Sequence, residues 1–426
     1  MKRVLIVAAF YPPLAGGGVH RVLSFTRHLP EHGWACTVIC AGEQDYWVRD
    51  ESLVARIPAG TEVLRVPGGS ASSAWLRFRG ARASGRRSDG ALAPLRSLAD
   101  WWWLPDSYAG WSRRAGALAA LRLARGGVDV VMSSSPPDSA HLAARDAAHE
   151  AGRPWVADFR DPWIGLYFRK PPTAWHRARQ AAMEASVTGS ADLVIAASRT
   201  HADQLSTRPA ARPRRLLHLP NGFEPAVFTP AGPADTQHCT LAFTGSLSLM
   251  EDAGTLLAAV ARVLAADPAA RTQLRVELAG PYDLDLESRA AALGLGGVVR
   301  FPGPLAHAES RVLQLAADWL LLWKPHGDGF RTMVPGKLYE YLDTGRPILA
   351  LLASGDEAAE LVRRAGGWVG EPGRVDLLAA EIAARLARWR ATGRERSARP
   401  DWLESHTRGA LAQKLAAELD ALAEGR

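Results

Sequence analysis

Cysteine is scarce in this chain of 426 residues, which has only Cys36, Cys40 and Cys239. The three form no Cys-x-x-Cys pair and no Cys/His cluster with the spacing of metal ligands. This pattern excludes a disulfide framework and a structural zinc site as the basis of the fold. It is typical of a reducing compartment, and we expect a cytoplasmic protein.

Long apolar runs are also missing, since none approaches the roughly 18 residues that a membrane-spanning helix needs. The opening sequence MKRVLIVAAF imitates a signal peptide, but it stops at Tyr11-Pro12-Pro13 without a small-residue cleavage site. We interpret it as the first buried strand. The Gly-x-Gly-x-x-Gly fingerprint is absent, because the glycines that follow are consecutive, and this argues against an NAD enzyme.

Lysine is rare as well, with five residues among 51 basic ones and a net charge of +7. Two of the five, Lys324 and Lys337, lie close to one stretch of the second half. An ammonium is a compact point charge that arginine does not reproduce, so these two lysines are a first indication that a point charge matters there. The mildly basic balance does not by itself indicate nucleic-acid binding, and we expect none.

Short apolar runs alternate with amphipathic segments along most of the chain, which predicts parallel α/β sheets. The length predicts two domains. Helices are expected near 19–29, 139–151, 174–190 and 402–423. Strands are expected near 3–10, 35–41, 63–66, 128–134, 155–159, 192–197 and 216–219, and again near 240–244, 274–278, 298–301, 319–323, 347–352 and 368–370.

The predicted architecture is α/β, with two doubly wound Rossmann-like domains facing across a cleft. We place the first domain at 1–215, with an insertion at about 68–127, and the second at 216–400. Residues 401–426 are expected to form a helix that packs back toward the N-terminal domain. Ligands of such sheets bind beyond the carboxyl ends of the strands.

The most informative stretch is RTMVPGKLYEYLDTGRPILA, residues 331–350. Pro335 stands where a first helical residue would, Gly345 where the helix would end, and an apolar strand follows. Lys337 and Glu340 lie three apart on this helix, so that a helix N-terminus, a cation and a carboxylate follow in order. This is the order needed to hold the phosphates and then the vicinal hydroxyls of a nucleoside diphosphate. The alternative is a solvated Glu340 paired with Lys337.

These residues, taken with several other short motifs, resemble the GT-B fold retaining glycosyltransferases often called family 4, the glycosyl transferases group 1. The resemblance covers nearly the whole chain. Its other motifs are Gly16-Gly17-Gly18, Ala191–Val194 with Ser198, Pro220–Glu224, Phe243–Ser246, Pro105-Asp106…Trp111, Ser135-Pro136-Pro137 and Asp158–Trp163.

Two departures from the family pattern concern the donor site. Members commonly carry two glutamates eight residues apart; here the second is Glu340 and the first position holds Thr332. Many also carry an Arg and Lys pair soon after the Gly-Ser turn, whereas residues 245–251 contain no cation. We therefore expect Arg331 and Lys337 to meet the phosphate charge, with Lys324 behind them.

The resemblance implies a nucleotide-diphosphate sugar as co-substrate, no other cofactor and no metal. The residues that we assign to donor binding are Gly16, Gly17, Gly18, Gly245, Ser246, Arg331, Lys337, Leu338 and Glu340. The catalytic candidates are Asp158, Arg160, Asp161 and Lys337. The acceptor-binding candidates are His20, Ser135 and Trp163.

Several of these assignments have a plain structural alternative. The glycine triplet serves equally as a tight turn, and His20 as a helix-surface residue. The acidic and basic residues at 158–161 form either a catalytic group that faces the transferred sugar or an internal Arg–Asp salt bridge. Trp101, Trp102 and Trp103, with the arginines before them, form either a peripheral contact with the inner face of the membrane or a local hydrophobic cluster.

The function expected from the resemblance is transfer of a sugar, of the hexosyl type, to a hydroxyl group of a glycan, a lipid-linked glycan or a natural product. Two alternatives stay open. One is an epimerase acting on a sugar nucleotide with the same fold. The other is a catalytically degenerate, transferase-like binding subunit, which the departures at Thr332 and in residues 245–251 would suit.

Overall fold

The computed structural model describes residues 1–14, 17–42, 49–68, 103–166, 171–208, 212–225, 237–247, 251–282, 285–395 and 398–425. The chain divides into two compact units. Unit 1 comprises residues 1–222 together with 408–426, and unit 2 comprises residues 223–407.

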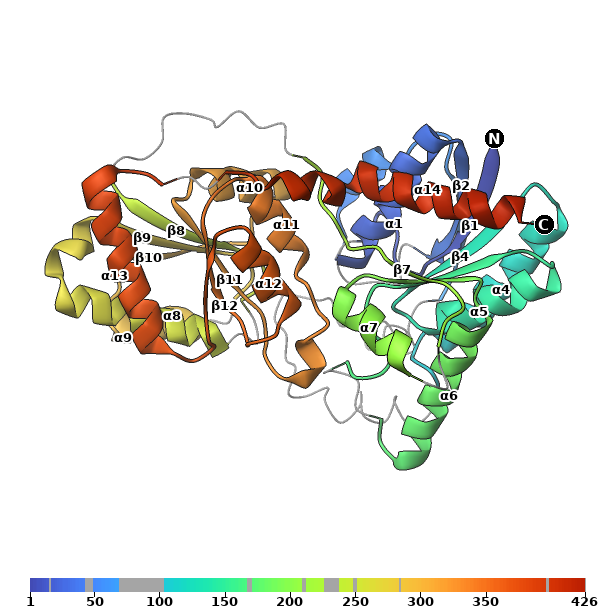
Figure 1. Ribbon diagram of the computed structural model, residues 1–426, viewed down its shortest axis with the longest axis horizontal. Helices are drawn as coiled ribbons and strands as arrows, with labels where there is room; N and C mark the ends of the chain where they lie inside the picture. The colour runs from blue at the N-terminus through green and yellow to red at the C-terminus, as the bar shows by residue number, and fades with distance from the viewer. Residues whose placement is uncertain are drawn as a thin grey trace. The chain divides into compact units, whose positions relative to one another are not determined.

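Unit 1 contains a seven-stranded parallel sheet in the order β3-β2-β1-β4-β5-β6-β7 (Figure 1). Its strands are β1 (Lys2–Val7), β2 (Trp34–Ala41), β3 (Glu62–Val66), β4 (Val130–Ser135), β5 (Trp155–Phe159), β6 (Leu193–Ala196) and β7 (Leu216–His218). Strands β4 and β5 are buried along their whole length, which explains why their sequences do not alternate between apolar and polar residues; Asp158 of β5 is the one charged side chain in the two strands.

The helices of unit 1 cover the sheet, and all of those described here except the last connect successive strands. They are α1 (Gly17–His28), α4 (Ala109–Ala124), α5 (Ser139–Glu150), α6 (Ala174–Ser190), α7 (Arg199–Thr207) and α14 (Arg408–Glu424), with 3₁₀ turns η1 (Leu29–His32) and η3 (Glu51–Arg56). Helix α4 packs on α5 and reaches the sheet, so the second part of the expected insertion is an ordinary sheet-covering helix. Residues 69–102 lie outside the described residues.

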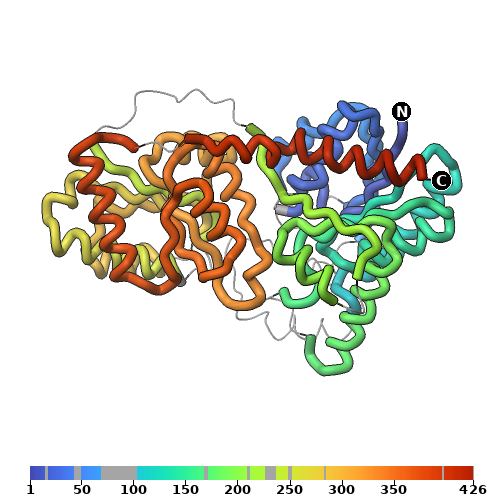
Figure 2. The backbone as a smooth tube through the Cα atoms, viewed as in Figure 1, coloured from blue at the N-terminus to red at the C-terminus, as the bar shows by residue number. Residues whose placement is uncertain are grey.

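The C-terminal helix α14 belongs to unit 1 although it follows all of unit 2 in the chain. Its side chains Leu411, Leu415 and Leu419 enter the core of unit 1. Lys2 forms an ion pair with Asp420 of this helix, with 2.9 Å between the charged atoms. Figure 2 shows the first strand and the last helix of the chain within the same unit.

Unit 2 contains a six-stranded parallel sheet in the order β10-β9-β8-β11-β12-β13. Its strands are β8 (Cys239–Thr244), β9 (Leu274–Ala279), β10 (Val299–Gly303), β11 (Trp319–Trp323), β12 (Ile348–Leu351) and β13 (Trp368–Gly370). Its helices are α8 (Glu251–Ala266), α9 (Asp285–Ala292), α10 (His307–Ala316), α11 (Gly336–Asp343), α12 (Glu357–Arg364) and α13 (Val375–Thr392), with 3₁₀ turns η5 (Pro268–Thr272), η6 (Asp328–Phe330) and η7 (Asp401–His406).

Helices cover both faces of the second sheet, and alternate side chains of β11 enter the two cores that result. Trp319, Leu321 and Trp323 enter the core that α8 and α13 complete. The alternate residues Leu320 and Leu322 enter the core that α11 and α12 complete. Because successive side chains of a strand point to opposite faces, a strand buried on both faces must be apolar throughout, as WLLLW is.

In each unit the first strand lies between the second and the fourth, so the winding of the sheet reverses beside it. This reversal occurs between β1 and β4 in unit 1, and between β8 and β11 in unit 2. In open parallel sheets such a position leaves a crevice beyond the carboxyl ends of the two strands, which is where ligands bind. The fold alone therefore directs attention to the residues after these four strands.

Candidate functional site

Gly245 and Ser246 follow β8 at the reversal of the second sheet, and both are exposed. Gly245 has a φ of 130°, and its amide donates a hydrogen bond to the Ala279 carbonyl at 2.9 Å. Gly280, which follows β9, has a φ of 142°, and a Cβ added there would lie 1.9 Å from the Gly245 carbonyl oxygen. Two glycines therefore shape this edge: one adopts a backbone conformation that other residues avoid, and the other lets the two turns approach closely.

Lys337, in the first turn of α11, reaches this glycine turn. Its ammonium lies 3.5 Å from the centre of the Phe243 ring and 3.3 Å from the Thr244 carbonyl oxygen, to which it donates a hydrogen bond. A Cβ on Gly245 would lie 3.3 Å from the same ammonium. Burial lowers the pKa of Lys337 to about 7, although the Glu340 carboxylate acts to raise it. The fold thus holds a desolvated amine beside an exposed glycine turn.

The N-terminus of α11 faces the loop that follows η6. Pro335 is the residue before the helix, with an extended backbone at φ −60° and ψ 129°, and within the described chain no side chain caps this end. Uncapped amides at a helix start carry partial positive charge and are suited to an anion. Leu338, a predicted donor residue, has its side chain fully buried in the core, so only its backbone is available to a ligand.

Glu340 lies one turn after Lys337, and its side chain is 23% exposed. One carboxylate oxygen of Glu340 is 3.1 Å from Nε2 of His307, the first residue of α10. The alternative considered from the sequence was that Glu340 forms an ion pair with Lys337. In the structure the Glu340 carboxylate contacts His307 instead, although its charge still acts to raise the pKa of Lys337. The carboxylate is therefore oriented by a neighbouring helix and keeps part of its surface open.

Helix α10 also fixes the backbone of α11 through Arg311, whose side chain is almost completely buried. Its guanidinium donates to the Glu340 carbonyl at 2.6 Å and pairs with Asp343 at 2.8 Å. Gln314, on the same helix, accepts a bond from Arg311 at 2.7 Å and donates to the Thr244 hydroxyl at 2.8 Å. This chain of contacts connects the end of β8 with the helix that carries Lys337 and Glu340.

The other predicted cations of unit 2 differ in their surroundings. Lys324 is buried, and its ammonium contacts the Phe330 carbonyl at 2.7 Å, the Met333 carbonyl at 2.6 Å and Asp356 at 2.6 Å. An ammonium has three donors, so Lys324 secures the loop before α11 and has no donor left for a ligand. Arg331 keeps 54% of its side chain exposed and lies 3.9 Å from Asp328.

Asp158, a catalytic candidate at the end of β5, is completely buried in unit 1. Its carboxylate accepts bonds from the Arg21 guanidinium at 2.7 to 3.1 Å and from the Ser134 hydroxyl at 2.8 Å. Arg21 also donates to the Pro220 carbonyl at 3.0 Å. Of the two interpretations left open by the sequence, this geometry favours an internal ion pair, with Arg21 as the partner that the sequence did not indicate.

Arg160 and Asp161 form an ion pair of their own at 2.9 Å and stay partly exposed, at 17% and 28% of their side chains. The Arg160 guanidinium occupies the space over Gly18, because a Cβ on Gly18 would lie 2.0 Å from its Nη1. Gly18 is in the first turn of α1, which begins at Gly17; Gly16 lies outside the described residues. Gly18 and the residues after β5 are therefore neighbours.

The three acceptor candidates have different surroundings. Trp163 is fully buried and donates its indole N–H to the Gln180 side chain, so it is a core residue. Ser135 is 2% exposed, and its hydroxyl has no hydrogen-bond partner in the described part of the chain. His20 is partly exposed on α1. The structure does not bring these three side chains to one surface.

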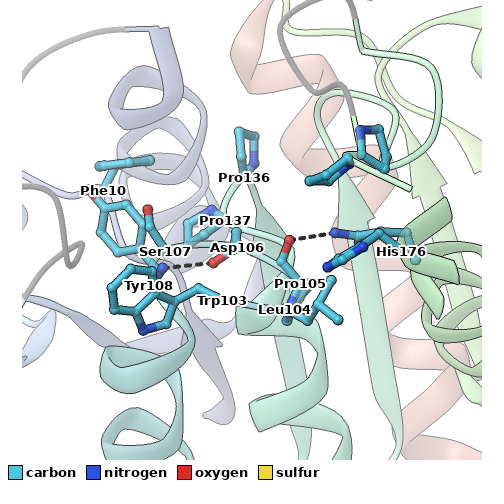
Figure 3. Close-up of a pocket in the computed structure, with 13 residues that line it drawn as sticks. Phe10, Trp103, Leu104, Pro105, Asp106, Ser107, Tyr108, Pro136, Pro137 and His176 are labelled. Carbon is cyan, nitrogen blue, oxygen red and sulfur yellow. Dashed lines mark hydrogen bonds between the residues drawn. The ribbon is translucent and has the colours of Figure 1, made fainter. Parts of the chain in front are cut away.

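A cavity of about 230 Å³ lies beyond the ends of β1 and β4, at the reversal of the first sheet. Figure 3 shows Phe10, Tyr108 and Trp103 on one side of it, Pro136 and Pro137 in the middle of the view, and His176 on the other side. Sequence reasoning missed this cavity, although it singled out Pro105-Asp106 and Ser135-Pro136-Pro137, which the chain brings together here. Trp103 lines the cavity and is 40% exposed, whereas Trp101 and Trp102 lie outside the described residues.

Among the described residues, no group of three or more His, Cys, Asp and Glu side chains has the arrangement of a metal site. Within the same residues, none of the helices combines the length and apolar character required to cross a bilayer.

Comparison with known proteins gives one family match. Residues 16–222 match the family model described as Glycosyl transferase 4-like domain. The D-inositol 3-phosphate glycosyltransferase of Geodermatophilus obscurus is 29% identical over 187 residues, which is 40% of this chain and 40% of that protein. The corresponding protein of Actinosynnema mirum is 28% identical over the same length, 44% of its own chain, so the match spans less than half of either relative.

Solved structures match over the whole length of the chain. A glycosyltransferase from Rickettsia africae ESF-5 has a TM-score of 0.63 at 12% identity and covers 100% of this chain and 99% of its own. A structure described as trehalose-6-phosphate from E. coli bound with UDP-2-fluoro glucose has a TM-score of 0.60 at 15% identity, covering 98% and 99%. At such identities the likeness shows the fold, and it confirms the predicted two-sheet α/β architecture of the GT-B type.

Proposed function

Because this chain belongs, through residues 16–222, to the glycosyl transferase 4-like family, we propose that it transfers a sugar from a nucleotide-diphosphate donor to a hydroxyl group of an acceptor. Transfer with retention at the sugar carbon, of the hexosyl type, is part of the proposal. So is a cytoplasmic location. The two curated relatives, named as D-inositol 3-phosphate glycosyltransferases, support the reaction class.

One observation carries the proposal: Lys337 and Glu340 lie on a short helix whose start no described side chain caps, and the Lys337 ammonium reaches an exposed glycine turn at the reversal of the sheet. We assign the diphosphate to Gly245, Ser246 and the first amides of α11. We assign the pentose hydroxyls to Glu340. A carboxylate accepts two hydrogen bonds at once from vicinal hydroxyls, and charge-assisted bonds of this kind are the stronger ones.

The reaction needs positive charge where the diphosphate leaves. Lys337 supplies it in this account, with Arg331 as a second, more exposed cation. In other enzymes a magnesium ion neutralises such a leaving group. We propose that these two side chains and the helix dipole take its place, so that full activity persists in EDTA. A strict requirement for magnesium would contradict this part.

In unit 1 we propose that Asp158 acts as a positioning residue, since its carboxylate is buried and bound by Arg21 and Ser134. Arg160 and Asp161 stay partly exposed above Gly18. They are our candidates for contact with the transferred sugar or the acceptor. A carboxylate in that position can orient a hydroxyl or stabilise positive charge that develops on the sugar.

The test begins with a thermal-shift screen of the intact protein against nucleotide sugars, because a ligand that binds only the folded state raises the melting temperature. The donor found in this way is then incubated with acceptors, and products are identified by mass spectrometry. A Glu340→Gln variant, which keeps shape but removes charge, should lose the thermal shift. No shift with any nucleotide sugar would overturn the proposal.

The same incubations distinguish the two other candidate functions from sugar transfer. An epimerase would convert the donor without any acceptor, so a changed sugar in a donor-only incubation would show that the protein is an epimerase. A degenerate binding subunit would bind the donor and turn over none of the acceptors. Transfer of the sugar only when both substrates are present is the outcome that the proposal predicts.

A further inference from the structure

The cavity of unit 1 is assembled from segments far apart in the sequence, and two polar side chains, the half-buried Asp106 and the buried Gln180, join them. Asp106 accepts bonds from the Ser139 amide at 2.9 Å, the Ser139 hydroxyl at 2.8 Å and the Tyr108 amide at 2.9 Å. It therefore ties the loop before α4 to the start of α5. Gln180 of α6, 5% exposed, donates to the Pro105 carbonyl at 2.7 Å and accepts from Trp163. The cavity is thus held open by a fixed frame.

Its walls are aromatic or proline-rich on most sides. Phe10 and Tyr108 meet edge to face, with ring centres 5.6 Å apart and planes at 77°. Trp103 adds a third ring on the same side, and His176 lies opposite (Figure 3). Aromatic faces attract the C–H groups and rings of a ligand. Two facing walls of this kind suit a flat or chair-shaped ring.

The described lining of the cavity offers no cation to an anion. Among the described residues that line it, none is a lysine or arginine, and the one carboxylate is Asp106. A phosphate placed there would lose its water without gaining a cation from these residues, and burying an unpaired charge is costly. Ser107 and His176 supply polar groups suited to a hydroxyl.

We propose that this cavity binds an uncharged six-membered ring carrying a hydroxyl group, and that it is the subsite for the acceptor; the second part rests on the proposed glycosyl transfer. The volume of about 230 Å³ equals roughly seven or eight molecules of liquid water, which is room for one ring and its substituents. A sugar and a phenolic ring share this chemistry.

The experiment is saturation-transfer NMR on the intact protein with three probes: methyl β-D-glucopyranoside, phenol and glucose 6-phosphate. We expect at least one uncharged probe to bind at millimolar concentration, and glucose 6-phosphate to bind about tenfold more weakly than methyl glucoside or not at all. Binding of the glucoside indicates a sugar acceptor, and binding of phenol alone indicates an aromatic one. Failure of both uncharged probes, or equal binding of glucose 6-phosphate, would overturn the proposal.

Variants locate the binding within the chain. Trp103→Ala removes one ring from the wall of the cavity, and it should lower the affinity for the uncharged probe by about tenfold. Trp175→Ala is the matched control, because Trp175 is an exposed tryptophan, at 62%, that does not line the cavity. Ser107→Lys should give measurable binding of glucose 6-phosphate. Equal probe affinity in wild type and Trp103→Ala would contradict the assignment.

Donor binding, measured on the same preparations by thermal shift, separates the two proposals. Trp103→Ala should keep the shift with the nucleotide sugar, and Glu340→Gln should keep the binding of the uncharged probe. If the wild type shows the donor shift but binds neither uncharged probe, the cavity assignment is refuted and the proposed function stands. If the wild type binds an uncharged probe but shows no shift with any nucleotide sugar, the proposed function is refuted and the binding of a ring in the cavity stands.

Discussion

The ammonium of Lys337 lies 3.5 Å from the centre of the Phe243 ring, at the end of the first strand of the second sheet. Phe243 in turn stacks on Trp323, with ring centres 4.2 Å apart and planes at 13°. The amine is therefore held over an aromatic stack whose inner rings belong to the core. Such a cation–π contact fixes its position without using all of its hydrogen-bond donors.

The first prediction concerns protons taken up on donor binding. Burial lowers the pKa of Lys337 to about 7, so in the free protein the amine is largely neutral at pH 8. A bound diphosphate favours the charged form and raises this pKa, so binding at pH 8 should take up about one proton, and binding at pH 6 almost none. Donor affinity should accordingly fall as the pH rises above 7.

Calorimetry in buffers of different ionisation enthalpy measures this uptake directly. A nucleotide sugar is the suitable ligand, because its phosphates do not titrate near neutral pH. Lys337→Met is the control, and it should bind more weakly and take up no proton. If the wild type at pH 8 took up none either, Lys337 would not be the group that meets the diphosphate.

The second prediction concerns Gly280, which faces the Gly245 carbonyl. In Gly280→Ala, a Cβ placed 1.9 Å from that oxygen, at a φ of 142°, forces the backbone to move. We expect a loss of about 1–3 kcal/mol in the free energy of unfolding. Donor affinity should fall as well, because the displaced turn is the proposed phosphate site.

Gly254→Ala is the matched control in the same unit. Gly254 lies within α8, where the nearest atom to an added Cβ is the Arg289 guanidinium nitrogen at 3.8 Å. This substitution should stabilise the protein by about 0.5–1 kcal/mol, since alanine is the better helix former. Urea unfolding and donor titration of both variants are the measurements; equal behaviour of the two would refute the role given to Gly280.

The third prediction concerns the Arg21–Asp158 pair, whose side chains are 2% and 0% exposed. Asp158→Ala leaves a buried guanidinium without its partner, and we expect a loss of about 3–5 kcal/mol in the free energy of unfolding. The double variant Arg21→Met, Asp158→Leu should recover much of that stability, because it leaves no uncompensated charge. A single substitution that costs less than about 1 kcal/mol would show that the pair does not hold unit 1 together.

The sequence predicted most strands because buried parallel strands are continuous apolar runs. WLLLW at 319–323 and VVMSSS at 130–135 are examples of such fully buried strands. It predicted α11 from Pro335, Gly345 and the spacing of its apolar face; the structure places Pro335 one residue before the helix. Signals of this kind are local, so they can be read without the fold.

What the sequence could not predict are partners distant in the chain. Arg21 and Asp158 are 137 residues apart, and His307 and Glu340 are 33 apart. Nothing near either residue in the sequence indicates its partner, because the pairing depends on which helix covers which strand. The cavity was missed for the same reason: Phe10, Tyr108 and His176 come from three separate segments.

The central claim is that Glu340 holds the sugar donor, and calorimetric titration of the intact protein with the donor tests it most directly. Wild type is compared with Glu340→Gln and with Glu360→Gln, a control at an exposed glutamate of α12. Loss of hydrogen bonds to a charged acceptor predicts at least about tenfold weaker binding for Glu340→Gln, with the control unchanged. The same affinity in all three proteins would contradict the account.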